Sequence, residues 1–167
     1  MINETVANLL NEQIGHEFDA MLQYIALSSW LESETLPELS GYFSAQADEE
    51  RVHALKMIKY LNDTGQKVII PEIPKPVSSF ASVAEAIELA YEQEVKVTRQ
   101  IEAIVNEASS ANDRITQNFL QWFLEEQVEE VASMDALRNV VKRAGDDLFR
   151  VEDYIAREGH PESNGVN

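Results

Sequence analysis

The stretch FSAQADEERVHALKM, residues 43–57, puts a carboxylate and an imidazole where a helix should present only apolar side chains. Phe43, Gln46, Glu50, His53 and Met57 recur every three or four positions, which is the spacing of one face of an α-helix. Glu50 and His53 are therefore expected to point into a helical core. No Lys or Arg shares this stripe to neutralise Glu50.

Three further stretches show the same pattern of an amphipathic helix with polar residues in the middle of its apolar stripe. They span residues 6–28, 83–104 and 120–141. The polar residues near the centres of these stripes are Glu17, Glu94, Gln127 and Glu130. Burying an unpaired carboxylate costs on the order of several kcal/mol or forces it to take up a proton. Four carboxylates in one core therefore need bound cations, and their charge balances two divalent metal ions.

A second interpretation applies to each of these positions taken singly. One Glu on a core face is usually a protonated or hydrogen-bonded core residue, and a lone Glu-x-x-His is a weak signal. Four mid-helix carboxylates together with His53 favour a metal site instead. Oxygen ligands with one imidazole suit iron or manganese, tolerate zinc and are too hard for Cu(I).

The composition favours a single all-α domain. Six Gly and five Pro are few among 167 residues, and no alternating strand pattern of useful length occurs. A chain of this length with 44% hydrophobic residues supports one core and is short for two. The lack of Cys excludes disulfides, thiolate zinc sites, iron–sulfur clusters and cysteine nucleophiles.

The chain is strongly acidic, with 30 acidic and 13 basic side chains and a net charge of −17. This charge repels nucleic acid and anionic membrane surfaces and concentrates cations, so we expect neither nucleic-acid nor membrane binding. The start, Met1-Ile2-Asn3-Glu4, lacks the features of a signal peptide. No run approaches the roughly 20 apolar residues of a membrane span. A cytoplasmic location is expected.

Capping signals divide most of the chain into long helices. The first is expected over residues 4–33. The second begins with the capping box Thr35-Leu36-Pro37-Glu38 and ends near Gly65. The third begins with the capping box Ser82-Val83-Ala84-Glu85 and ends near residues 109–110.

Two more helices complete the expected domain. Asn112 or Asp113 can cap the fourth, which runs to Gly145. Asp146 or Asp147 can cap a short fifth helix that ends near Gly159. The domain is thus expected to span residues 1–159, with residues 160–167 forming a disordered tail.

The connection between the second and third helices differs from the short turns elsewhere. Residues 66–81 contain three prolines that forbid helix and favour an extended path. At about 3.3 Å per residue this segment reaches roughly 50 Å, whereas its neighbouring helices are roughly 40 Å long. It can therefore cross the whole bundle, and the second and third helices should run parallel. The four glutamates lie near the midpoints of their helices, so they should meet in one layer.

These features together resemble a non-haem bacterial ferritin over nearly the whole chain. The motifs that carry the resemblance are Glu17 with Tyr24, Glu49-Glu50-Arg51-Val52-His53, Glu94, Trp122, and Glu126-Gln127-Val128-Glu129-Glu130. Glu-x-x-His is itself a known feature of ferritin-like carboxylate proteins. The resemblance implies an all-α, ferritin-like four-helix bundle with a long crossover between helices two and three and a short fifth C-terminal helix.

The resemblance also implies roles for individual residues. Glu17, Glu50 and His53 would hold the first iron of a ferroxidase centre. Glu50 would bridge to a second iron held by Glu94 and Glu130. Gln127 would form hydrogen bonds beside the pair, and Tyr24 would serve as an electron donor or hydrogen-bond partner. The residues that match the third iron site of bacterial ferritins are Glu49, Glu126 and Glu129, which would share Glu130. For these three, ordinary surface acids remain the alternative.

Two departures distinguish the chain from neighbouring families. Gln127 and Glu130 stand where bacterioferritins have a second Glu-x-x-His, and Arg51 follows Glu50 where they have a haem-binding Met. Neither haem nor a symmetric bacterioferritin centre is therefore expected. Rubrerythrins usually add a cysteine-bound iron, which this chain cannot hold.

The expected function is iron storage and detoxification. Fe(II) would be oxidised by dioxygen or hydrogen peroxide at the paired site and deposited as a ferric mineral. The resemblance implies that the mineral lies inside a hollow homo-oligomeric shell of 24 subunits. A helical bundle with an inert or absent metal site is one alternative. A di-iron oxygenase acting on an organic substrate is another, and it would require an apolar substrate tunnel.

Overall fold

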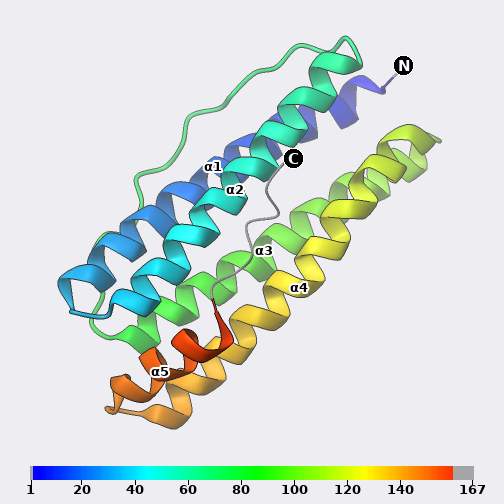
Figure 1. Ribbon diagram of the computed structural model, residues 1–167. Helices are drawn as coiled ribbons and strands as arrows, with labels where there is room; N and C mark the ends of the chain where they lie inside the picture. The colour runs from blue at the N-terminus through cyan, green and yellow to red at the C-terminus, as the bar shows by residue number, and fades with distance from the viewer. Residues whose placement is uncertain (1, 160–167) are drawn as a thin grey trace.

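The computed structural model describes residues 2–159, and these form five α-helices (Figure 1). The helices are α1 (Glu4–Ser33), α2 (Pro37–Asp63), α3 (Val83–Ser110), α4 (Arg114–Ala144) and α5 (Leu148–Glu158). The all-α prediction with a short fifth helix is confirmed. The tail expected to be disordered, residues 160–167, lies outside the described residues.

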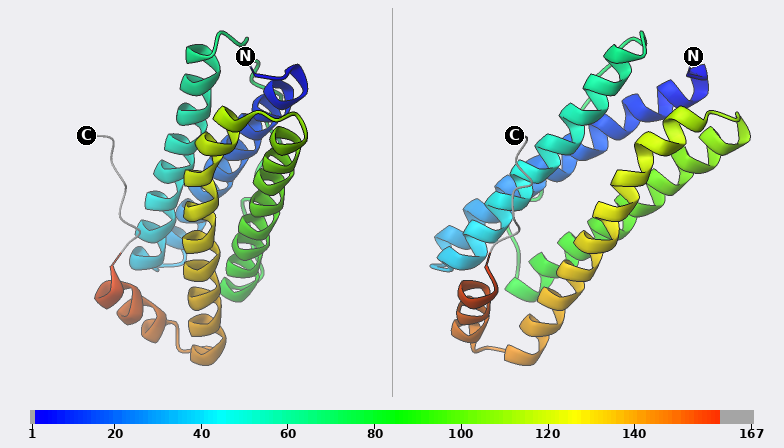
Figure 2. Two further views of the ribbon diagram at one scale, coloured as in Figure 1. Left: turned by 90° about the vertical axis from the view of Figure 1, so that its right-hand side faces the viewer. Right: turned by 45° about the vertical axis from the view of Figure 1, so that its right-hand side comes forward.

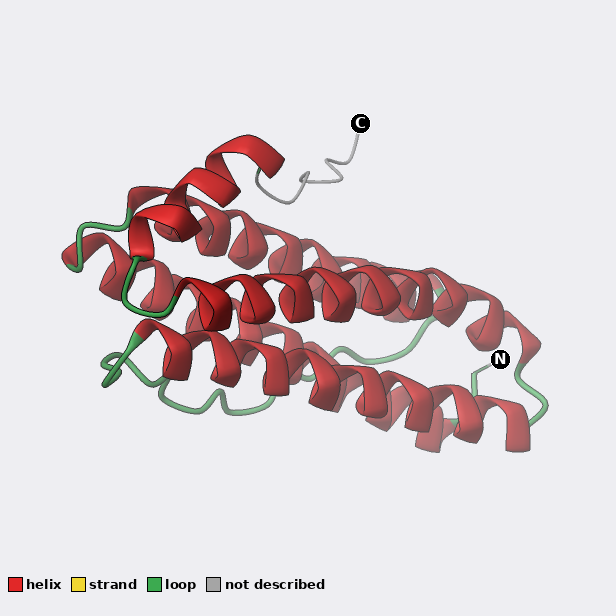
Figure 3. Ribbon diagram, turned by 90° about the horizontal axis from the view of Figure 1, so that it is seen from below, coloured by secondary structure: helices red, strands yellow, loops and turns green. Residues whose placement is uncertain are grey.

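The first four helices form a bundle of two antiparallel hairpins, α1 with α2 and α3 with α4 (Figures 1 and 2). The segment between Asp63 and Val83 has no regular secondary structure and runs back along the length of the bundle. α2 and α3 consequently run parallel, as the length of this segment predicts. α5 lies across the end of the bundle, against α2 and α4 (Figure 3).

Side chains of α1 hold the crossover segment in place. The Asn11 side chain donates to the carbonyl of Lys67 at 3.0 Å and accepts from the amide of Ile69 at 2.7 Å. Gln23 does the same for Val77, donating to its carbonyl at 2.8 Å and accepting from its amide at 2.9 Å. Both amides satisfy backbone groups of an extended segment that has no strand partner.

Of the four expected N-terminal caps, two are confirmed by a side-chain hydrogen bond, and Asp147 takes the cap position of α5 without such a bond. The fourth, Thr35, is wrong. Ser82 accepts from the amide of Glu85 at 3.1 Å, and Asp113 accepts from the amide of Thr116 at 3.0 Å. Thr35 instead adopts a positive φ of 62°, so it lies outside the cap and Leu36 takes that position. Glu152 of α5 replaces the missing cap.

The hydrophobic core falls into two clusters along the bundle. One contains the C-terminal half of α1 and the start of α3, with Leu27, Phe43 and Ile87 among its buried residues. The other contains the N-terminal part of α1 and the end of α3, including Leu10 and Ile104. A layer of buried polar side chains lies between them. Across residues 2–159, none of the helices is both long and apolar enough to cross a membrane.

Candidate metal centre

All four long helices contribute a buried polar side chain to the middle of the bundle. Glu17 comes from α1, Glu50 and His53 from α2, Glu94 from α3, and Gln127 and Glu130 from α4. Their exposed fractions lie between 0% for Glu94 and 7% for Glu130. The periodicity of each helix thus carries its polar residue inward together with the apolar residues of the same stripe.

These side chains form two groups with spacing suited to metal ions. Glu17, Glu50 and His53 form the first group, and Glu50, Glu94 and Glu130 form the second. Within each group, one potential ligand atom per residue lies within 4.8 Å of the others. Glu50 belongs to both groups, so its two oxygens can bridge neighbouring ions.

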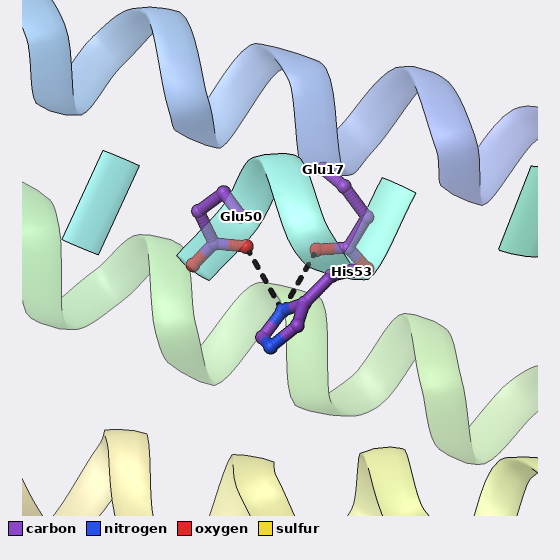
Figure 4. Close-up of side chains that lie close together, drawn as sticks. All are labelled: Glu17, Glu50 and His53. Carbon is purple, nitrogen blue, oxygen red and sulfur yellow. Dashed lines mark ion pairs between the residues drawn. The ribbon is translucent and has the colours of Figure 1, made fainter. Parts of the chain in front are cut away.

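His53 lies at the centre of this arrangement (Figure 4). Its Nδ1 atom is 3.3 Å from a Glu50 oxygen and 3.7 Å from a Glu17 oxygen. Its Nε2 atom is 3.7 Å from a Glu130 oxygen. The rings of Trp122 and Phe123 pack against the imidazole, with centroid distances of 5.4 and 5.9 Å. These aromatic neighbours fix the ring and exclude water.

Unpaired carboxylate oxygens show that a cation fits here. Both oxygens of Glu50 are buried without a hydrogen-bond partner, as is one oxygen each of Glu17 and Glu94. Buried acceptors without donors are costly, because they lose their hydration and gain nothing in return. Divalent ions with a preference for oxygen ligands would satisfy all of them.

Protonation relieves the repulsion when no cation is present. Burial and the charges of Glu94 and Glu17 raise the pKa of Glu50 well above its usual range. Burial also raises the pKa of Glu94 to about 7, and burial with the charges of Glu50 and Glu94 raises that of Glu130.

Glu17 behaves differently from the other three acids. Burial opposes its ionisation, but hydrogen bonding and charge from His53 outweigh this and lower its pKa. Burial likewise opposes charge on His53, yet Glu17 and Glu130 raise the pKa of the imidazole to about 9. In the metal-free protein, the shifts therefore favour the charged forms of Glu17 and His53 as an ion pair and the protonated forms of Glu50, Glu94 and Glu130.

Further side chains orient the carboxylates through hydrogen bonds. The Tyr24 hydroxyl donates to Glu94, and the Gln127 amide donates to Glu130. Gln13 donates to Glu17 at 2.8 Å. Thr98 donates to the side-chain oxygen of Gln127 at 2.8 Å, which leaves the Gln127 nitrogen directed at Glu130.

Comparison with known proteins shows the family to which the chain belongs. Residues 7–144 match the family described as Ferritin-like domain. Ferritin BfrB of Mycolicibacterium smegmatis is 43% identical over 150 residues, which cover 90% of this chain and 83% of that protein. The chain belongs to the ferritin family.

Other ferritins resemble the chain over similar lengths. The bacterial non-heme ferritin of Campylobacter jejuni is 35% identical over 158 residues, covering 93% of this chain and 95% of its own. The structure of an open pore ferritin from the archaeon Archaeoglobus fulgidus aligns with a TM-score of 0.90 at 32% identity. That alignment covers 94% of this ferritin and 97% of the archaeal chain.

The three residues matched to a third iron site lie beside the centre, in a pocket between α2, α4 and α5. This pocket has a volume of about 690 Å³, and Glu49, Glu126, Glu129 and Glu130 line it. Glu49 and Glu126 are half-buried, whereas Glu129 is exposed. Burial and the charges of Glu126 and Glu129 raise the pKa of Glu49 to about 7, although His53 opposes this. Neither of the two ligand-spaced groups of this ferritin includes Glu49, Glu126 or Glu129.

The sequence reasoning missed the roles of Gln13 and Thr98. Gln13 lies on the inward stripe four residues before Glu17, and that spacing is the signal that pairs them on one helix face. Thr98 lies beside the stripe, and no spacing within the sequence links it to Gln127.

Proposed function

We propose that this ferritin stores iron by oxidising Fe(II) to Fe(III) at the buried carboxylate centre and releasing the product as a mineral. The supporting observation is that Glu50 belongs to two ligand groups at once. One group supplies an imidazole, and the other supplies only carboxylates. Two Fe(II) ions bound in these groups would lie close enough to act on one oxidant together.

The charge of the centre fits this reaction. Binding of two divalent ions would displace the protons of Glu50, Glu94, Glu130 and His53 and leave the four carboxylates to neutralise the metal charge. Each Fe(II) gives up one electron. Dioxygen takes both electrons with two protons and becomes hydrogen peroxide, or hydrogen peroxide takes them and becomes water.

The side chains of the protein bind the two ions and orient the carboxylates around them. His53 would fix the first iron, and Gln13 would keep Glu17 in position beside it. Gln127 and Tyr24 would orient Glu130 and Glu94 at the second iron, which lacks an imidazole and is held more weakly. The second ion is thus the one expected to leave first after oxidation. Glu49, Glu126 and Glu129 would receive it in the adjoining pocket as a third site.

A storage role requires a container for the mineral. We propose a homo-oligomeric shell of 24 subunits without haem, located in the cytoplasm. The net charge of −17 supports this role, since an acidic interior would concentrate iron cations.

Stopped-flow absorbance tests the proposal directly. Two Fe(II) per subunit mixed with the wild-type protein in aerobic buffer should oxidise much faster than in buffer alone and should saturate at that ratio. Glu50→Ala should reduce the fast phase at least a hundredfold, because neither group is then complete. Asp48→Ala, which removes an exposed acid of the same helix, is the matched control. Equal fast phases in Glu50→Ala and wild type would refute the assignment.

A further inference from the structure

A lysine lies over the indole ring that packs against His53. The ammonium nitrogen of Lys56 in α2 is 3.4 Å from the centroid of the Trp122 ring in α4. Trp122 packs edge-on against His53 at a centroid distance of 5.4 Å. The indole therefore contacts both a cation and the imidazole that would hold the first iron, and the proposed oxidation uses neither Lys56 nor Trp122.

No ion pair accounts for the position of Lys56. Among residues 2–159, the lysine and arginine side chains in ion pairs are those of Lys59, Arg138 and Arg150. Burial lowers the pKa of Lys56, and the charge of Glu126 opposes this shift. Contact with the negative face of the indole, together with the charge of Glu126, thus compensates the ammonium group for its lost hydration.

A cation at this position changes how easily the indole loses an electron. The neutral ring attracts the ammonium group through its π system. A ring that has lost one electron carries a positive charge, so the attraction becomes repulsion. Both side chains are half-buried, and the repulsion is therefore only partly screened. Lys56 thus makes the one-electron oxidation of Trp122 less favourable.

This effect matters when only one of the two metal sites is filled. One Fe(II) gives dioxygen one electron, which yields superoxide. Superoxide becomes hydrogen peroxide by taking a second electron and two protons, and in the proposed reaction the second Fe(II) supplies that electron. When the second site is empty, the indole beside His53 is an alternative donor. It would give up one electron and its N–H proton, and water would supply the other proton.

We propose that the charge of Lys56 keeps Trp122 from supplying this electron, so that dioxygen is reduced by Fe(II) and the indole stays intact. Lys56 acts through Trp122 and is a positioning residue, which places a positive charge over the ring. Trp30 packs edge-on against Phe80 and, within the described part of the chain, has no cation over its ring. That the electron would go to dioxygen at an iron centre rests on the proposed function; the effect of the charge on the ring does not.

Oxidation of the metal-free protein by hexachloroiridate(IV) tests the charge effect without iron. This anion takes one electron from an indole and becomes hexachloroiridate(III). In a Trp30→Phe background, Trp122 is the single tryptophan of the chain, so the loss of tryptophan fluorescence follows its oxidation. Lys56→Gln should raise the rate about tenfold, since it removes a charge 3.4 Å from the ring. Weaker attraction of the anionic oxidant would change the rate in the opposite direction.

Two variants in the same background separate the charge over the ring from other effects. Lys56→Arg keeps a cation there and should stay within about twofold of the background protein. Lys59→Gln removes an exposed positive charge from the same helix and should also stay within about twofold. An unchanged rate in Lys56→Gln, or an equal rise in Lys56→Arg or Lys59→Gln, would overturn the proposal.

Peptide mass spectrometry after iron turnover gives a second readout. Repeated aerobic additions of one Fe(II) per subunit to the assembled protein should add oxygen to Trp122 severalfold more in Lys56→Gln than in wild type. Modification of Trp30 should be equal in both proteins, and equal modification of Trp122 would contradict the protective role. If Fe(II) is oxidised no faster than in buffer, the proposed function fails, whereas the hexachloroiridate(IV) rates still decide whether Lys56 protects the ring.

Discussion

At Glu50, two buried oxygens without hydrogen-bond partners lie beside three other acids and one imidazole. In the metal-free protein the raised pKa values of Glu50, Glu94 and Glu130 mean that protons take the place of the cations. Iron and protons therefore compete for the same oxygens. Iron binding should release protons, and it should become tighter as the pH rises.

The same competition predicts how the stability of the metal-free protein depends on pH. Glu94, with a pKa of about 7, holds a proton that the same carboxyl would lose near pH 4.5 in the unfolded chain. His53, with a pKa of about 9, holds a proton that an unfolded histidine would lose near pH 6.5. The folded state thus binds more protons between these limits, so its stability falls as the pH rises from about 5 to 9. The lowered pKa of Glu17 acts only below pH 4.5.

Thermal unfolding of the metal-free protein at pH 5.5 and 8.5 measures this effect. The midpoint should be lower at pH 8.5, and the difference should be smaller in Glu94→Gln, which cannot bind the proton. A midpoint that rises with pH would contradict the assigned protonation states.

Thr98 offers a test of how the second ion is held. Thr98→Val keeps the shape of the side chain but removes the donor to Gln127, so Gln127 is no longer fixed toward Glu130. In an anaerobic Fe(II) titration, the ion held by Glu50, Glu94 and Glu130 should bind severalfold less tightly than in wild type. The affinity for the ion held by Glu17, Glu50 and His53 should be unchanged. Gln13→Leu should weaken binding of the ion held by Glu17, Glu50 and His53 and leave the other ion unchanged, since Gln13 donates a hydrogen bond to Glu17. Equal effects of both variants on both ions would refute the separate roles.

At the scale of the elements, α5 supplies the cap that α2 lacks. The two carboxylate oxygens of Glu152 accept from the amides of Glu38 and Leu39 at 2.8 and 3.0 Å. An acid at this position also interacts favourably with the dipole of α2. Glu152→Ala should lower the stability by about 1 kcal/mol, the usual effect of losing a cap.

Thermal unfolding measures the loss, with Asp153→Ala, an exposed acid of α5, as the control. Fast Fe(II) oxidation should persist in Glu152→Ala, because the cap lies at the end of the bundle. A midpoint equal to that of the control would show that the contact does not stabilise the fold.

Close packing of the crossover on α1 provides a second test at this scale. A Cβ atom added at Gly15 would clash with Cγ of Pro71, so the crossover must shift. Gly15→Ala should therefore destabilise the protein by about 1–3 kcal/mol, despite the higher helix propensity of Ala. Pro71→Ala in the same chain should restore much of the loss. If Gly15→Ala alone raised the unfolding midpoint, the close contact would be disproved.

The sequence predicted the elements that depend on local patterns and failed where distant segments meet. The stripes gave the inward direction of Glu17, Glu50, Glu94 and Glu130, and the Ser82 and Asp113 caps follow from neighbouring residues. The pattern predicts Thr35 as a cap because the competing acceptor, Glu152, lies 117 positions further along the chain. The role of Thr98 is not predicted for a related reason, since its contact with Gln127 comes from packing between α3 and α4.

At the scale of the whole molecule, a polar layer lies between two apolar cores. The cores hold the bundle together at both ends, so the layer can carry unfavourable charge without unfolding the protein. This separation explains why a centre of four acids is compatible with a stable fold. Substitutions in the polar layer should therefore change iron binding more than they change the free energy of unfolding.

Assembly into a shell predicts a role for exposed apolar residues. Phe149 of α5 is 83% exposed, whereas Val151 and Ile155 of the same helix are buried. If fifth helices meet around an axis of the proposed shell, Phe149 lies in that contact. Phe149→Asp should then give smaller particles by light scattering, or shells that dissociate more readily on heating. Particle size and thermal dissociation equal to wild type would contradict a contact there.

The most direct test of the account is the position of iron in crystals grown and soaked with Fe(II) without oxygen. Anomalous maps at the iron edge should show two peaks per subunit, one between Glu17, Glu50 and His53 and one between Glu50, Glu94 and Glu130. The first peak should be the stronger, because it includes the imidazole. Iron bound elsewhere, or a single peak that does not involve Glu50, would contradict the shared carboxylate on which the proposed function depends.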